Sequence, residues 1–185
     1  MSEPTPGAAP QPDAEVDTVL RAAVREIEAH AAESGWDRPP RLYALVPTDE
    51  LLTREPRLAS SLGLDLAAVA GSLTPVEQEP LLPDRRLEDV LAGILWPGEV
   101  VGAAAVLERV VLPAAAEAQL PDDPERAELF AAQHPDRQEV RMAAGVLRDG
   151  RSHCVLRMRA HEDALLEGDT LVPALVGMLA HTMQD

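Results

Sequence analysis

Two arginines stand two residues apart in a run that alternates between apolar and polar side chains, from Cys154 to Arg159. In an extended strand Arg157 and Arg159 point to the same side, roughly 6–7 Å apart along the chain, and His153 shares that side. The planar guanidinium of arginine suits carboxylates and phosphates. This face could therefore bind a small anionic ligand, with His153 as a polar neighbour.

The alternative for these arginines is neutralisation by carboxylates of the same chain. The 185 residues carry 32 acidic side chains against 16 basic ones, so acids compete for every arginine. Two like charges on one strand face also need something negative near them. The composition favours this second interpretation, and it predicts that Arg157→Ser destabilises the fold.

A second candidate for acid–base chemistry is the stretch from His134 to Arg137, where an imidazole and the carboxylate of Asp136 lie close in sequence. Pro135 excludes helix at His134, so a local turn is the competing interpretation and the favoured one. No nucleotide-binding, hydrolase or metalloprotease motif occurs, and no two histidines have metal-ligand spacing. We expect no cofactor, no metal and no catalytic residue. The single cysteine, Cys154, is expected to be a small core residue.

The elements that position these residues centre on a hairpin. Asp149-Gly150 lies between two strand-like runs, and a two-residue turn there would pair Val146 with His153 and Met142 with Arg157. Cys154, Leu156 and Met158 would then form the core side of the second strand. The obvious partner for that side is the apolar face of an N-terminal helix.

Helical periodicity begins at Asp13 and ends at Ser34-Gly35, with Glu28 assigned to the polar face. A last helix starts near Asp169 or Thr170, after a polar loop at residues 161–163. Between them we expect strands at 41–46 and 106–112, short helices from Thr48, at 87–94 and at 124–133, and an extended segment at 74–77. Glu108 and Arg109 should each find a cross-strand partner.

Together these elements predict an α+β fold: a two-layer antiparallel sheet of about four or five strands with the N- and C-terminal helices packed on one face. We expect residues 1–12 to be a disordered leader and residues 13–185 to form a single domain. Within that domain residues 54–85 are an irregular or helical insert, and residues 114–137 are an acidic connector.

The net charge of −16 opposes binding to nucleic acid and to anionic membranes. The start of the chain lacks the apolar core of a signal peptide, and no apolar run reaches 18 residues. We therefore expect a cytoplasmic protein.

Three segments carry a family resemblance: GWDRPPRLYALVPT at 35–48, ILWPGEVVGAAAVLERVVLP at 94–113, and HPDRQEVRMAAGVLRDG with CVLRMRAHE at 134–162. The chain resembles an actinobacterial family of conserved proteins with no assigned activity. The resemblance implies a cytoplasmic protein from a high-GC bacterium, and it supplies no catalytic residues.

Two functions remain. The first is a non-catalytic binding module, a homodimer or the holder of a protein partner, using a sheet face or the acidic connector. The second is an enzyme or sensor for a small anion, with Arg157 and Arg159 as its binding face and His153 or His134 moving a proton. The absence of a nucleophile–base or metal signature favours the first.

Overall fold

The computed structural model describes residues 12–57, 69–81 and 85–184. Within these ranges six strands form one sheet in the spatial order β2-β1-β3-β4-β5-β6, and every neighbouring pair is antiparallel. The strands are β1 (Arg41–Pro47), β2 (Leu73–Glu77), β3 (Gly102–Val111), β4 (Gln138–Leu147), β5 (Ser152–Met158) and β6 (His161–Gly168). The predicted α+β class with an antiparallel sheet is confirmed, although the sheet has six strands rather than four or five. The predicted leader lies outside the described residues except for Pro12.

Two helices flank the sheet in sequence, α1 (Pro12–Glu33) and α8 (Pro173–Thr182). The shorter helices between them are α2 (Thr48–Arg54), α5 (Leu87–Leu91), α6 (Ala114–Glu117) and α7 (Pro124–Gln133). As the sequence indicated, α1 ends just before Gly35, which adopts a φ of +79° that glycine tolerates. The last helix begins three residues later than Thr170, because Pro173 occupies its first turn, where its missing N–H has no intrahelical partner to lose.

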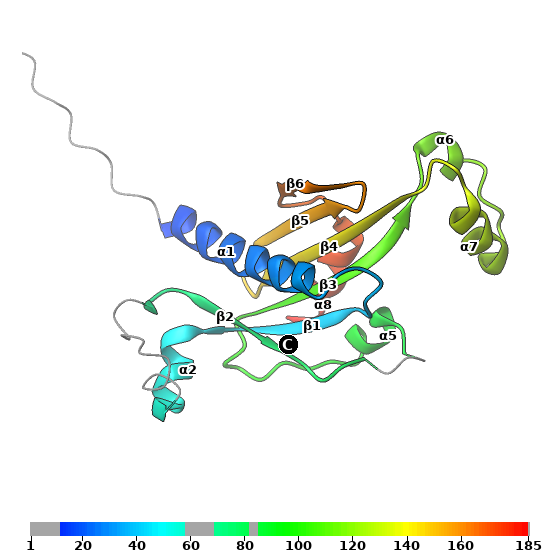
Figure 1. Ribbon diagram of the computed structural model, residues 1–185. Helices are drawn as coiled ribbons and strands as arrows, with labels where there is room; N and C mark the ends of the chain where they lie inside the picture. The colour runs from blue at the N-terminus through cyan, green and yellow to red at the C-terminus, as the bar shows by residue number, and fades with distance from the viewer. Residues whose placement is uncertain (1–11, 58–68, 82–84, 185) are drawn as a thin grey trace, which may run out of the picture.

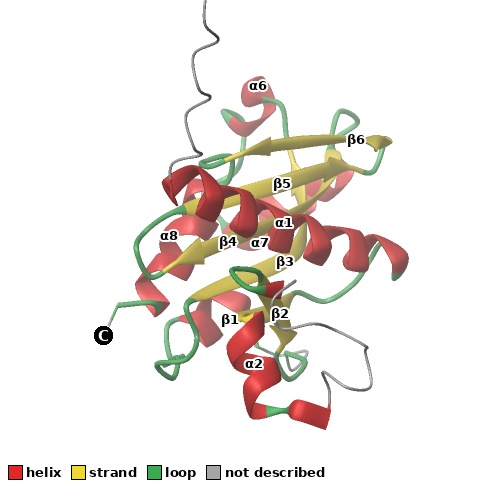
Figure 2. Ribbon diagram, turned by 90° about the vertical axis from the view of Figure 1, so that its left-hand side faces the viewer, coloured by secondary structure: helices red, strands yellow, loops and turns green. Residues whose placement is uncertain are grey.

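The prediction that both terminal helices pack on one face is wrong. α1 lies across one face of the sheet and α8 lies on the opposite face, so the domain has three layers (Figure 2). The reason is visible in β3, where Ala103 and Ala105 pack with α8 while Ala104 and Val106 pack with α1. A strand that is apolar on both faces needs cover on both.

α1 packs closely over Gly145 in β4. A Cβ atom at that position would lie 2.7 Å from Val24 Cγ2 and 3.2 Å from Leu20 Cδ1. The absence of a side chain at Gly145 therefore lets α1 pack close to β4.

The hairpin register differs from the prediction by one residue. Val146 lies opposite Ser152 rather than His153, and Met142 lies opposite Leu156 rather than Arg157. The loop is one residue longer because the amide of Leu147 donates to the carbonyl of Arg151, with Gly150 at a φ of +89°. The side of β5 that meets α1 is accordingly the Val155 side, whereas Cys154 packs with α8.

The two edge strands, β6 and β2, include one segment that the sequence predicted as a loop and one that it predicted as extended. Residues 161–163, expected as a polar loop, open strand β6, which has no alternation to reveal it because most of its side chains are exposed. Thr74 to Glu77 is extended, as favoured, and forms most of β2.

β3 extends beyond β1 and, paired with β4, forms an arm. Residues 107–111 of β3 pair only with β4, since the pairing with β1 ends at Val106. At the end of this arm, residues 114–137 fold into α6 and α7 and project from the body of the domain (Figure 1). We call residues 114–137 the α6–α7 lobe; it coincides with the predicted acidic connector.

Candidate functional site

The arginine face of β5 lies under α1, and its first partner is a carboxylate from that helix. Glu28 is 1% exposed, and its two carboxylate oxygens accept hydrogen bonds from Arg157 Nε at 2.6 Å and from a terminal nitrogen of Arg157 at 2.7 Å. Arg157 also donates to the carbonyl of Glu162 in β6. The hydrogen bonds to the Glu28 carboxylate are the largest cause of the raised pKa of the Arg157 guanidinium.

A second arginine from β4 completes the cluster. Arg141 is buried, lies 3.7 Å from Glu28 and donates to Glu108 Oε1 at 3.1 Å. Glu108 stands directly opposite it on β3, so the expected cross-strand partner of Glu108 is confirmed. The Arg141 guanidinium also stacks on Trp36, with Cζ 4.3 Å from the ring centroid.

The partner of Arg109 is different from the one expected. Its guanidinium lies 3.2 Å from Glu88 of α5 rather than beside a residue of a neighbouring strand. The side chain points to the α8 face, where α5 lies, so a helix residue is the acid within its reach.

Arg159 closes the open end of the same face. It donates to Asp37 at 3.1 Å and to Glu139, and its Cζ lies 5.6 Å from the Trp36 ring centroid. Asp37 has a φ of +62°, and its amide donates to Glu108 Oε2 at 2.7 Å. The turn after α1 is thus tied to β3, β4 and β5 by one continuous network.

We call the side chains of Glu28, Glu108, Arg141 and Arg157 the ion network. Two carboxylates face two guanidiniums, so the network is neutral. Within the described residues every buried side-chain nitrogen or oxygen has a hydrogen-bond partner. A neutral and satisfied cluster positions α1 on the sheet, and removing one member would leave a buried charge uncompensated. As the composition favoured, carboxylates of the same chain neutralise these arginines: Glu28 pairs with Arg157, and Glu108 pairs with Arg141.

His153 lies farther along β5 on the same face, with its own partners. Its Nε2 is 3.2 Å from Glu167 Oε2, and Glu167 also accepts a hydrogen bond from Arg21 Nε of α1 at 2.8 Å. The bond from Arg21 lowers the pKa of Glu167 most, with a further contribution from His153. This group repeats the pattern of the ion network: a carboxylate joins α1 to the outer strands.

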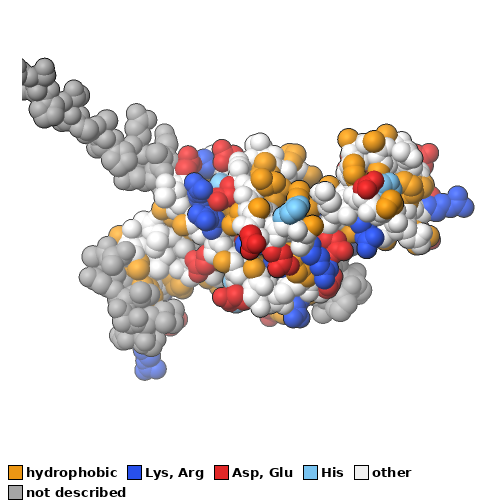
Figure 3. Space-filling view, turned by 45° about the horizontal axis from the view of Figure 1, so that its top comes forward, with side chains coloured by type: hydrophobic (Ala, Val, Ile, Leu, Met, Phe, Trp, Pro, Cys, Tyr) orange, Lys and Arg blue, Asp and Glu red, His pale blue; other side chains and the backbone are white. Residues whose placement is uncertain are grey.

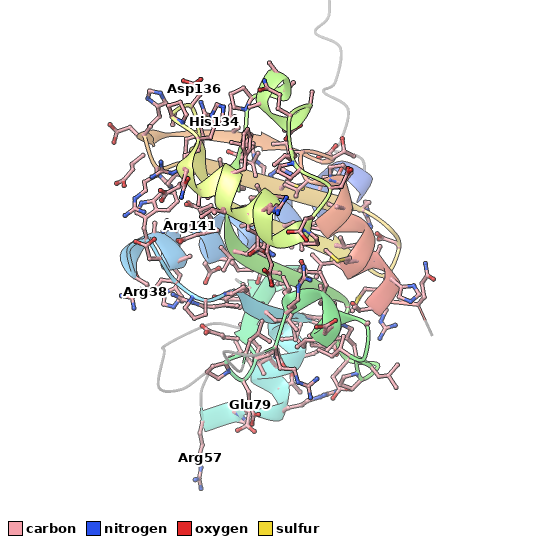
Figure 4. The ribbon with its side chains drawn as sticks, turned by 90° about the vertical axis from the view of Figure 1, so that its right-hand side faces the viewer. Arg38, Arg57, Glu79, His134, Asp136 and Arg141 are labelled. Atoms are coloured by element: carbon pink, nitrogen blue, oxygen red, sulfur yellow. The ribbon has the colours of Figure 1, made fainter. Side chains whose placement is uncertain are left out.

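His134 and Asp136 lie on the connection between α7 and β4, apart from Arg141 in the sheet (Figure 4). The Asp136 amide donates to His134 Nδ1 at 3.1 Å, and the imidazole stacks on Phe130 with ring centroids 5.5 Å apart. The local turn favoured from the sequence is therefore present, with the ring as acceptor.

Of the five candidate residues, the structure places Arg157, Arg159 and His153 on one face and His134 with Asp136 elsewhere. A cavity of about 370 Å³ lies at the end of β4, β5 and β6 and contains only one of the five, Arg159. Its lining residues are Arg137, Gln138, Glu139, Met158, Arg159, Ala160 and His161.

The sequence prediction missed Glu28 and Arg141, the two most buried members of the network. Glu28 was assigned to the polar face of the helix, yet it lies four residues after Val24 and three before Ala31, both buried. This spacing places it on the apolar stripe. The signal was present: a carboxylate within the stripe requires a basic partner on the surface that the stripe covers.

The remaining candidates for chemistry are few. Cys154 is buried, as expected, and burial raises the pKa of its thiol. Among the described residues, no group of three or more His, Cys, Asp and Glu side chains is arranged to hold a metal ion. No helix in the described part of the chain combines the length and apolar character needed to cross a membrane.

Comparison with known proteins adds one result. A family model described as PPA1309-like protein matches residues 20–184. No curated protein and no solved structure matches the chain. The matched range contains all three segments on which the family resemblance was based. The expected membership of an uncharacterised family is confirmed, and the chain belongs to the PPA1309-like proteins.

Proposed function

We propose that this protein is a non-catalytic binding module of the cytoplasm that holds a protein partner through the α6–α7 lobe. The observation that carries the proposal is the exposure of apolar side chains on this lobe. No residue of α7 is buried, and Leu129 is 57% exposed. Phe130 beside it is partly exposed, and Leu120, which precedes the helix, is exposed.

The lobe is well formed although it contributes little to the core. Asp123 caps α7 by accepting a hydrogen bond from the Arg126 amide at 3.0 Å, and Pro124 occupies the first turn. Pro135 ends the helix. An ordered helix that keeps its apolar residues outside the core is typical of a surface that a partner covers.

The charge of the lobe indicates the chemistry of the partner. Residues 114–137 contain six carboxylates and two arginines. In Figure 3 the lobe projects at the right-hand side, with apolar side chains in orange and carboxylates in red. A segment that combines apolar and basic residues complements this surface, whereas a second copy would bring acidic lobes onto a chain that carries a net charge of −16.

The alternative, an enzyme or sensor for a small anion, gains no support from the contacts. Both arginines on which it depends are bound to carboxylates of the same chain, Arg157 to Glu28 and Arg159 to Asp37 and Glu139. An anion would have to displace those carboxylates. Glu28 is buried, so a displaced Glu28 carboxylate would lose its hydrogen bonds without gaining water in their place.

Site-specific photo-crosslinking in growing cells tests the lobe. A benzophenone amino acid replaces Leu129 in one variant and Leu95 in the control; Leu95 is 87% exposed on the loop before β3. We expect one defined adduct at Leu129 and none of it at Leu95. Mass spectrometry should show a linked peptide that is basic and apolar, because that chemistry complements the lobe.

The yield of the adduct should also depend on the negative charge of α7. Glu125→Gln with Glu128→Gln should lower the yield of the adduct several-fold, because both carboxylates flank Leu129 on α7. Equal labelling at Leu129 and Leu95 would contradict the proposal. An adduct with a second copy of this chain would also contradict it, because it would show that the lobe mediates self-association.

A further inference from the structure

The two edges of the sheet differ in their ability to accept another strand. An edge strand presents unpaired N–H and C=O groups, and natural sheets commonly block such edges with proline. β2 has Pro75 at its centre, opposite Leu45, and is only five residues long. β6, at the other edge, has eight residues and no proline; its register against β5 shifts at Met158, so residues 165–168 are the regular part of this edge. Proline therefore blocks the β2 edge and is absent from the β6 edge, the two edges of the sheet in Figure 1.

A row of apolar side chains leads to this open edge. Met142 of β4 lies opposite Leu156 of β5, and Leu156 lies opposite Leu166 of β6. Met142 and Leu156 are partly buried, while Leu166 at the end of the row is 52% exposed. An apolar side chain on a strand added beside β6 would cover Leu166 and continue the row.

The charge of β6 favours a basic segment over a second copy of this chain as the strand that pairs with this edge. The strand carries Glu162, Asp163 and Glu167 and no arginine. Glu167 is already paired with Arg21 and His153, so Glu162 and Asp163, both exposed, are the carboxylates that a partner would meet. Antiparallel pairing of two copies would bring the Glu162 and Asp163 carboxylates of both chains to one edge, on chains that already repel each other, and like charges across strands are destabilising. A segment that alternates basic and apolar residues instead matches both the carboxylates and Leu166.

We propose that the outer edge of β6 is a docking site for an extended segment of a partner protein, rich in arginine or lysine and in β-branched residues, which adds a seventh strand. Strand addition of this kind takes its affinity from main-chain hydrogen bonds and its specificity from alternate side chains. This site uses the backbone of β6 and Leu166, whereas the proposed function rests on the apolar side chains of α7, so either proposal can fail without the other.

The test uses the full chain and a synthetic eight-residue peptide of alternating arginine and valine, matched in length to β6. Its twin has the same sequence with N-methyl groups on alternate residues, which removes main-chain donors and keeps every charge. Fluorescence anisotropy gives the affinities at physiological salt, and amide NMR locates the contact. We expect the twin to bind at least about tenfold more weakly, because main-chain bonds carry the affinity. Slower exchange should appear at the amides of β6.

A matched pair of variants separates the two edges. Leu166→Ser should weaken binding of the peptide several-fold, whereas Val76→Ser in β2, also exposed in the wild type, should leave it unchanged. Equal binding of the peptide and its N-methylated twin would overturn the proposal, since attraction to net charge alone explains that result. Chemical shift changes confined to the α6–α7 lobe, or β6 protection that rises with protein concentration in the absence of peptide, would also overturn it.

Discussion

Glu28→Gln is expected to lower the free energy of unfolding by about 3–5 kcal/mol, a large share of the about 5–15 kcal/mol that holds a typical domain together. The amide has the same shape as the carboxylate and can still accept a hydrogen bond. It carries no charge, so Glu108 alone would face the guanidiniums of Arg141 and Arg157, and one positive charge under α1 would be left uncompensated. Urea denaturation monitored by circular dichroism measures the loss.

Two variants make this result specific to the ion network. Glu26→Gln makes the same chemical change on an exposed position of α1 and should alter stability by less than about 0.5 kcal/mol. Adding Arg157→Gln to Glu28→Gln should recover part of the loss, because it removes the uncompensated positive charge and leaves Arg141 paired with Glu108. Wild-type stability in the Glu28→Gln variant would show that the network is not structural.

The second large effect concerns the opposite face of the sheet, where α8 is held by apolar packing. Leu179 is fully buried among β3, β4 and β5 residues, and we expect Leu179→Ala to cost about 2–5 kcal/mol. Lost transfer energy and the remaining cavity both contribute to this cost. Salt should not change the loss, because no charge is involved.

Leu129→Ala is the matched control for Leu179→Ala, with the same side chain removed from an exposed site. It should change the unfolding free energy by less than about 0.5 kcal/mol. Similar losses from the two substitutions, again by urea denaturation, would mean that the α6–α7 lobe is part of the folding core and that its leucine is not available to a partner.

The sequence predicts the elements of this fold better than their arrangement. Helical spacing from Asp13 and strand-like runs around Asp149-Gly150 identify α1, β4 and β5 because local periodicity reports local structure. The side of the sheet on which each helix packs is not local information. β3 and β4 are apolar on both faces, so their alternation cannot assign α1 to one face and α8 to the same or the other.

An error of one residue in the hairpin register is enough to change which residues of β4 and β5 are assigned to the same face of the sheet. Asp149-Gly150 suits a two-residue turn and also a three-residue loop with glycine in the left-handed region. A difference of one residue changes which side chains lie opposite one another, so the partner of Val146 was wrong. The alternation within β5 itself does not depend on the turn, and Arg157 and Arg159 do share a face.

The arginine face was found from the sequence, while its partners were not. Charge balance predicted that carboxylates of the same chain would meet Arg157, and Glu28 does so. The identity of that carboxylate depends on how α1 crosses the sheet, which no local pattern determines. Its position within the buried stripe of α1 is the one clue that the sequence offered.

The most direct test of whether the arginine face is structural or binds a ligand is thermal melting in the presence of anions. Wild type and Arg157→Gln are melted with phosphate and with small dicarboxylates at constant ionic strength. Because Glu28 already occupies Arg157, we expect the wild type to gain no more than about one degree from any anion, and the variant to melt several degrees lower in every buffer. A wild type that gains several degrees from one anion, beside a variant that is stable without anion and gains nothing, would contradict the account.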